Sequence, residues 1–305
     1  MSWARVLLTA CLLAQDPTAL KLDVQVVSVD VTVVDSKGNL VNQLGKDDFL
    51  ISENGIPQSI RFFSPVSAPY NVFLLFDSSD STRGDRQFMV EAAVALLDNL
   101  QPQDRVAFGS FDDGFRRHLS WTSDRNLAAV ALREISQPHE SHETHFYSAL
   151  DETLRKEFKG ITGRRAVVVL TDGHDTRSLY GSNGDLKKVL QSAREQRIPV
   201  FLVALPGQKA SQVVFPNTKA YLETMRFNMQ HIVDNSGGEI LFSEDLDDVV
   251  RLYEQLGRRL GMAYSLGYVP SNSSANGSFR RIQVKTRDDS LHLSQSREGY
   301  YARPR

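Results

Sequence analysis

Phe73-Leu74-Leu75-Phe76-Asp77-Ser78-Ser79-Asp80-Ser81 is the stretch that decides the fold of this chain. An uninterrupted apolar run ends abruptly in an Asp-x-Ser-x-Ser pattern. Strands that are apolar on both faces are typical of parallel sheets covered by helices on each side. Ligands bind such sheets beyond the carboxyl ends of the strands, so this pattern predicts a binding edge at Asp77.

The side chains at this edge carry oxygen donors. The carboxylate of Asp77 and the hydroxyls of Ser79 and Ser81 suit Mg²⁺, Mn²⁺ or Ca²⁺ rather than zinc or copper. A plainer interpretation is a strand followed by a helix N-cap, because Asp and Ser are preferred caps. An N-cap needs only one such residue, so it does not explain oxygen donors at three alternate positions.

Two further oxygen-bearing segments follow along the chain. An apolar run at 165–170 predicts a second buried strand, which ends in Thr171-Asp172-Gly173. Thr144 lies in a polar loop, His139 to His145, just before a segment with the apolar spacing of a helix. The sequence therefore places oxygen donors after two strands and in one loop.

In this order and context, the segments resemble the metal-ion-dependent adhesion site of von Willebrand factor type A domains. The resemblance implies that hydroxyls coordinate the metal and that carboxylates bind it directly or through water. It leaves the sixth position for a carboxylate of a partner protein. The ligands that it implies are Asp77, Ser79, Ser81, Thr144 and Asp172.

The function implied by the resemblance is non-enzymatic. We expect a divalent-metal-dependent, adhesion-type protein-binding domain, with Mg²⁺, or alternatively Mn²⁺ or Ca²⁺, and a partner protein that offers an Asp or Glu carboxylate. Two positions depart from the family pattern. His142 and Glu143 stand where glycines often precede the loop threonine, and Asp80 stands where glycine is frequent. Asp80 either strengthens cation binding by its charge or is a solvated surface residue.

Two alternatives stay open. The first is a hydrolase or phosphoryl-transfer enzyme that uses the same metal as a Lewis acid. It needs a general base, for which His174, His142 and His145 are candidates. The sequence contains no Walker loop, Gly-x-Ser-x-Gly elbow or His-Glu-x-x-His motif. The second alternative is a structural protein whose oxygens only cap helices.

Composition excludes some partners. The formal net charge of the 305 residues is -2, so no basic field exists that would attract nucleic acid. Cys11 is the only cysteine, so no intramolecular disulfide forms within this sequence. No segment has the roughly 20 apolar residues of a membrane-spanning helix, and we expect no integral membrane span.

The first residues resemble a leader. One arginine precedes the apolar run Val6 to Ala14, which is similar to a short secretory signal with a cut after Ala14. Leu8-Thr9-Ala10-Cys11 also resembles a lipoprotein cleavage box, although the apolar run before it is short. A frayed N-terminal strand is the plainer interpretation. We expect a secreted, periplasmic or cell-envelope-associated protein.

The chain divides into four segments. We expect a leader at 1–19, a β segment at 20–66, a type-A-like α/β domain at 71–261 and a β segment at 262–305 that packs with 20–66. Alternating valines from Val27 to Val33 predict a half-buried strand, Asn54-Gly55 predicts a hairpin turn, and Gln58 to Phe63 is expected to be one strand.

The expected fold class is α/β. It combines a doubly wound, mostly parallel, Rossmann-like sheet with a small β-sandwich built from N- and C-terminal strands. Beside the three metal loops, short motifs lie along the chain: Asp48-Phe49 with Glu53-Asn54-Gly55, Ser236-Gly237-Gly238, Leu266-Gly267-Tyr268 and Gly299-Tyr300-Tyr301. In this order they resemble bacterial VWFA-related domain proteins over nearly the full chain.

Overall fold

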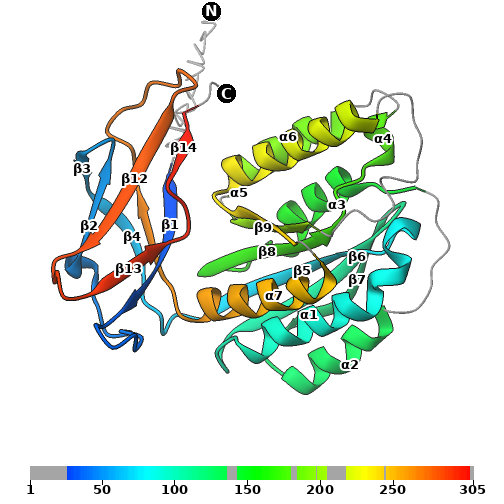
Figure 1. The fold of residues 1–305 in the computed structure, drawn as a ribbon, viewed down its shortest axis with the longest axis horizontal. Coiled ribbons are helices and arrows are strands. Elements are labelled where there is room, and N and C mark those ends of the chain that lie inside the picture. Colours follow the sequence, from blue (N-terminus) through cyan, green and yellow to red (C-terminus); the bar gives the residue numbers. More distant parts are fainter. Residues whose placement is uncertain are drawn as a thin grey trace, which may run out of the picture.

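A computed structural model describes residues 26–135, 143–179, 184–196, 198–204, 218–243 and 245–302. The expected leader at 1–19 and the loop residues His139 to His142 lie outside these ranges. The described chain forms a helix-covered sheet with a smaller all-β part beside it (Figure 1). The predicted fold class is confirmed.

The central sheet has the strand order β10-β9-β8-β5-β6-β7. Its strands pair in parallel except for β7, which runs antiparallel to β6. All eight residues of the central strand β5 are buried, as its apolar sequence predicts. The strands are β5 (Tyr70–Asp77), β6 (Arg105–Phe111), β7 (Phe115–Thr122), β8 (Arg164–Thr171), β9 (Val200–Ala204) and β10 (Glu239–Phe242).

Helices cover both faces of this sheet (Figure 1). One face carries α1 (Arg86–Asp98), α2 (Arg125–Ile135) and α7 (Leu246–Gly261). The other carries α3 (Phe146–Glu152), which continues as a π-helical turn (Thr153–Glu157), with α5 (Gly184–Gln196) and α6 (Thr218–Ser236). The short elements are 3-10 turns at Lys46–Asp48 and Asp80–Asp85 and the helix α4 (Thr176–Leu179).

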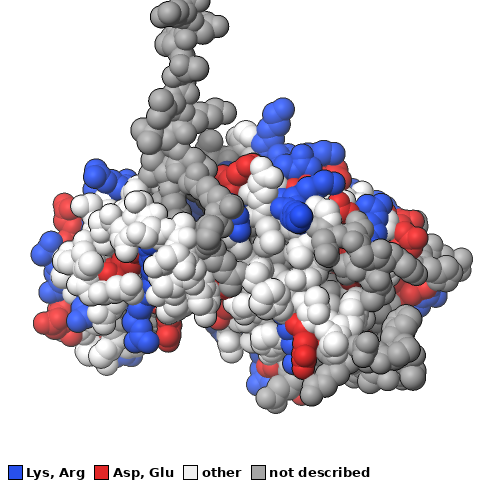
Figure 2. All heavy atoms as spheres, turned by 90° about the horizontal axis from the view of Figure 1, so that it is seen from above, with Lys and Arg blue, Asp and Glu red and all other residues white. Residues whose placement is uncertain are grey.

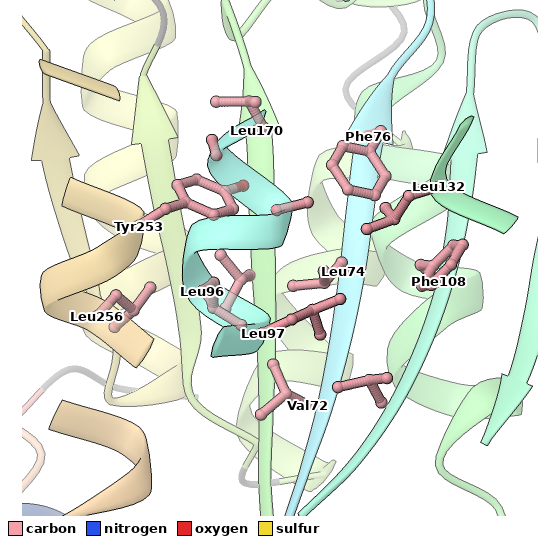
Figure 3. Packing of buried hydrophobic residues seen from close by; sticks show 14 of the residues in the cluster. Val72, Leu74, Phe76, Leu96, Leu97, Phe108, Leu132, Leu170, Tyr253 and Leu256 are labelled. Atoms are coloured by element: carbon pink, nitrogen blue, oxygen red, sulfur yellow. The ribbon is translucent and has the colours of Figure 1, made fainter. Parts of the chain in front are cut away.

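The first core lies between β5 and the helices α1 and α7 (Figure 3). This buried cluster includes Leu74 and Phe76 of β5, Leu96 of α1 and Tyr253 of α7. Met89 of α1 is buried in this core, whereas its neighbour Phe88 is only half-buried. α1 begins at Arg86, directly after a 3-10 turn.

Two antiparallel four-stranded sheets form the sandwich, and each mixes strands from both ends of the chain. Their orders are β13-β1-β11-β4 and β14-β12-β2-β3. Alternate residues of β1 oppose alternate residues of β11, with Val27 beside Tyr268 and Val31 beside Tyr264. The strands are β1 (Val27–Val34), β2 (Phe49–Glu53), β3 (Ile56–Gln58), β4 (Ile60–Ser64), β11 (Tyr264–Tyr268), β12 (Phe279–Thr286), β13 (His292–Gln295) and β14 (Gly299–Tyr301).

The prediction of one strand from Gln58 to Phe63 is wrong. Gln58 pairs with Ile51 in one sheet, whereas Ile60 pairs with Tyr268 in the other. The chain therefore crosses between the sheets at Ser59, as strands do at sandwich corners. The Asn54-Gly55 hairpin forms as predicted, since both residues adopt positive φ angles of 51° and 81°.

Arg164 joins the two parts of the molecule. Its guanidinium donates hydrogen bonds to the carbonyls of Val66, Ala68 and Leu260, and it lies 4.3 Å from the ring centroid of Tyr70. The hydroxyl of Tyr70 in turn lies 3.2 Å from Asp30 Oδ2 in β1. The segment boundaries at 66, 71 and 262 stay predictions.

On the face drawn in Figure 2, basic and acidic side chains of the described residues lie in small groups interspersed with neutral ones. Within the described ranges, no helix is long and apolar enough to cross a membrane.

Candidate metal site

Asp77 stands at the carboxyl end of β5 and is fully buried. Its Oδ1 atom accepts hydrogen bonds from the backbone N–H of Ser79 at 3.0 Å and from the Ser79 hydroxyl at 2.5 Å. The Ser79 and Ser81 hydroxyl oxygens lie 2.9 Å apart. The chain after β5 therefore curls around the carboxylate and brings these first three expected ligands together.

The neighbouring strand β8 adds the next polar groups. The Thr171 hydroxyl donates to Asp77 Oδ2 at 2.8 Å and accepts from the N–H of Gly173 at 2.9 Å. Asp172 is half-buried, and its Oδ1 accepts from the N–H of His174 at 3.0 Å. This contact of the two motifs follows from the parallel pairing of β5 with β8.

The electrostatics of Asp77 are unfavourable for a buried carboxylate. Desolvation by burial and the negative charge of Asp172 raise the pKa of Asp77 to about 7, against 3.8 for an ordinary aspartate. The hydrogen bonds from Ser79 and Thr171 act in the opposite direction and are outweighed. The edge thus concentrates negative charge that hydroxyls and amides compensate only partly.

Thr144 is buried and reaches this edge from a different loop. Its carbonyl accepts from the N–H of Thr176 at 2.9 Å, so its loop is bonded to the loop that follows Asp172. The next residue, His145, donates its N–H to the carbonyl of Asp112 at the end of β6, at 2.7 Å. Coordination of one metal by all five expected ligands stays a prediction.

The donor chemistry fits a hard divalent cation. Carboxylate and hydroxyl oxygens at one sheet edge match the preferences of Mg²⁺, Mn²⁺ and Ca²⁺. Among the residues that the structure describes, no group of three or more His, Cys, Asp and Glu side chains forms a metal site. The expected ligand set contains only two such side chains, because its other members are hydroxyls.

Sequence reasoning missed Arg86 in the first turn of α1. This residue is buried, and it donates to the carbonyl of Ser78 at 2.8 Å. Its positive charge also interacts with Asp77, Asp80 and Asp112. A signal existed, because a cation at a helix N-terminus opposes the helix dipole and indicates a specific partner.

The remaining candidates have local partners. Asp80 pairs with Arg83 at 2.6 Å on the surface, which favours the interpretation of Asp80 as a solvated residue. His174 Nδ1 lies 3.3 Å from the Tyr221 hydroxyl, and His145 Nε2 lies 2.8 Å from Glu143 Oε2. His142 lies outside the described residues.

The geometry defines an α/β protein with a cluster of oxygen donors at the carboxyl edge of its parallel sheet. The model of the von Willebrand factor type A domain matches residues 71–241, more than half of the chain. The chain therefore belongs to the von Willebrand factor type A domain family, as its motifs predict.

Solved structures share the fold. A von Willebrand factor type A protein from Catenulispora acidiphila aligns with a TM-score of 0.53 at 11% identity, over 92% of this chain and 75% of that one. Proximal thread matrix protein 1 from the mussel byssus, described with a zinc-occupied MIDAS motif, aligns with a TM-score of 0.51 at 14% identity. That alignment covers 67% of this chain and 48% of the mussel protein. No curated protein matches the chain.

Proposed function

We propose that this protein is a non-enzymatic, divalent-metal-dependent protein-binding domain. Asp77, Ser79, Ser81, Thr144 and Asp172 would hold Mg²⁺, or alternatively Mn²⁺ or Ca²⁺. The observation that carries the proposal is the pairing of buried Asp77 with Asp172, whose mutual repulsion a bound cation would relieve. Membership of the type A family supports an interaction role.

The residues of the proposed site have two roles, to orient the Asp77 carboxylate and to hold the cation. Ser79 and Thr171 fix the two oxygens of the Asp77 carboxylate in one orientation through hydrogen bonds. A bound cation would supply a concentrated positive charge in a partly dry environment, where contact with a partner's Asp or Glu carboxylate is strong. The partner class is therefore a protein with an exposed acidic side chain, and nucleic acid does not fit the overall charge of -2.

The expected location follows from the leader-like sequence at residues 1–14. We propose export to the cell surface, the periplasm or the medium, where adhesion-type contacts form. Detection of the protein in a surface or secreted fraction, and its loss when the leader is removed, would test this part. Retention of the full-length protein in the cell interior would contradict it.

A metal titration tests the site. Calorimetry with Mg²⁺, Mn²⁺ and Ca²⁺ should give one binding event per chain in the wild type. We expect at least about a hundredfold weaker binding in Asp77→Asn and a similar loss in Ser79→Ala, because each variant removes a ligand. Zinc belongs in the titration, because the mussel byssus relative is described with zinc in its motif.

Ser52→Ala is the matched control, since this serine lies in the sandwich with a single long contact of 3.5 Å to the carbonyl of Gln283. Equal metal affinity in wild type, Asp77→Asn and Ser79→Ala would reject the site. Pull-down of protein partners with and without a chelator then tests the adhesion role. Hydrolysis of generic ester or phosphate substrates that stops in His174→Ala would favour the enzymatic alternative instead.

A further inference from the structure

We infer that Asp175 and Thr176 are positioning residues that lock the Thr144 loop to the Asp172 loop. The two loops would then present their oxygens as one preformed unit. This inference rests on the proposed metal site and adds a function for residues that are not themselves ligands. It predicts that the metal affinity depends on a hydroxyl that never touches the metal.

Thr176 forms hydrogen bonds with both the N–H and the carbonyl of Thr144. Its hydroxyl accepts from the N–H of Thr144 at 3.0 Å and lies 3.2 Å from the Thr144 carbonyl, to which it donates. Its own N–H donates to the same carbonyl at 2.9 Å. Both peptide groups of the predicted ligand are therefore held by a single residue of the other loop.

Asp175 holds the same segment from its other end. This aspartate is buried, and its Oδ2 accepts from the N–H of Tyr147 in the first turn of α3 at 3.0 Å. The N-cap residue of α3, His145, supplies no side-chain cap of its own. Asp175 therefore satisfies an orphan amide at the start of α3 from a separate loop, where its charge also complements the helix dipole.

The loop that carries these two residues is itself constrained. Gly173 has φ +81°, and a Cβ atom there would stand 2.9 Å from the sulfur of Met229. Any other residue would strain the backbone at this positive φ and would displace the Met229 side chain. On the other side, Phe146 and Leu150 anchor α3 in the second core. Both ends of the lock are thus attached to rigid elements, as preorganised ligands require.

Thr176→Val tests the lock, because valine keeps the shape and removes the hydroxyl. We expect its Mn²⁺ dissociation constant to rise about tenfold, the lower end of the range for residues that orient ligands. Thr176→Ser should restore the wild-type affinity to within about twofold, because it keeps the hydroxyl. Thr224→Val is the matched control, since the Thr224 hydroxyl bonds only its own helix, at Ala220.

A double-mutant cycle separates positioning from general loosening. In a Thr144→Ala background, Thr176→Val should change the affinity by less than about twofold, because the ligand that it orients is gone. Equal losses in both backgrounds would overturn the inference. An unchanged affinity in Thr176→Val, with a wild type that binds Mn²⁺, would also overturn it while leaving the proposed site intact.

Hydrogen exchange gives a readout without metal. Amides of residues 143–147 should exchange faster in metal-free Thr176→Val than in the wild type or in Thr224→Val. Asp175→Asn, which keeps an acceptor oxygen, should show a smaller increase in the same amides. Unchanged exchange in Thr176→Val would refute the lock itself. A wild type that binds no divalent cation would instead refute the proposed function, and the role of the lock with it.

Discussion

Glu53 in the sandwich and Asp77 at the edge of the parallel sheet are both buried carboxylates, but their surroundings differ. Glu53 Oε1 accepts from the guanidinium of Arg280 at 3.1 Å. Its Oε2 accepts from the hydroxyls of Tyr268 and Tyr300 at 2.7 and 2.8 Å. The sandwich therefore neutralises its buried charge with its own side chains.

Asp77 is surrounded differently. Its hydrogen bonds come from hydroxyls and one amide, and its strongest charged neighbour is another carboxylate, Asp172. The difference supports a structural role for Glu53 and the proposed metal-binding role for Asp77. A carboxylate with a buried arginine partner completes a core, whereas a buried carboxylate beside a second one would be stabilised by the proposed cation.

Loss of the Glu53 counter-charge should have the largest effect. Arg280→Leu leaves Glu53 buried without its cation, and breaking such a pair typically costs about 3–5 kcal/mol of unfolding free energy. The same guanidinium also donates to the carbonyls of Asn272 and Ser274, which lose a partner. Thermal and denaturant unfolding measure the loss, and metal affinity at the distant site should not change.

Glu53→Gln combined with Arg280→Leu is the control, because it removes the unpaired charge. We expect the double variant to be more stable than Arg280→Leu alone. A single variant as stable as the wild type would show that Glu53 does not depend on its arginine, and the contrast with Asp77 would fail.

Among the described residues, Asp77 has no such arginine partner in hydrogen-bond contact, and the pH dependence of the unfolding free energy should reveal the cost of burying it. Its pKa is raised to about 7 in the folded protein, above the value of 3.8 for an ordinary aspartate. The folded state therefore binds more protons than the unfolded state between these values. It follows that the contribution of Asp77 to stability is present below about pH 4 and is lost as the pH rises towards 7.

Divalent cation should reverse this loss. At a Mg²⁺ concentration about a hundredfold above the dissociation constant, binding adds roughly 2.7 kcal/mol to the unfolding free energy. Denaturant unfolding at pH 5 and pH 8, with Mg²⁺ and with chelator, measures both effects. Other groups titrate as well, so the difference between wild type and Asp77→Asn isolates this site. Metal-free curves with the same pH dependence in the two proteins would contradict the prediction.

The sequence predicted the polar residues at the strand ends, but not the residues that form hydrogen bonds with them in space. Asp77 and Asp172 could be predicted, because each follows an apolar strand that stops abruptly. The hydrogen bond from Thr171 to Asp77 could not, because it depends on which strands are adjacent in the sheet. Asp175 and Thr176 were missed for a similar reason, since their partners lie about thirty residues away.

The sandwich shows the same limit. Alternation predicted the half-buried strand of valines that forms β1, and the structure pairs this strand with β11. Alternation does not record a change of sheet, so the division at Ser59 into β3 and β4 escaped it. The Glu53 cluster also escaped, because its four members come from β2, β11, β12 and β14.

Substitution of Asp80 should have the smallest effect on Mg²⁺ affinity. It tests whether an exposed carboxylate next to the proposed ligands contributes to cation binding. It replaces the glycine that is frequent in the family motif, and its charge is next to the proposed ligands Ser79 and Ser81. Its carboxylate lies 2.6 Å from Arg83, with 35% and 48% of the two side chains exposed, so solvent and this arginine screen it. We expect Asp80→Asn to weaken Mg²⁺ binding by no more than about threefold at 0.15 M salt, and somewhat more at low salt.

Calorimetric titrations at both salt concentrations measure this change in affinity, with Asp77→Asn as the reference for a full loss. A loss in Asp80→Asn as large as that in Asp77→Asn would mean that Asp80 turns towards the cation and belongs to the site.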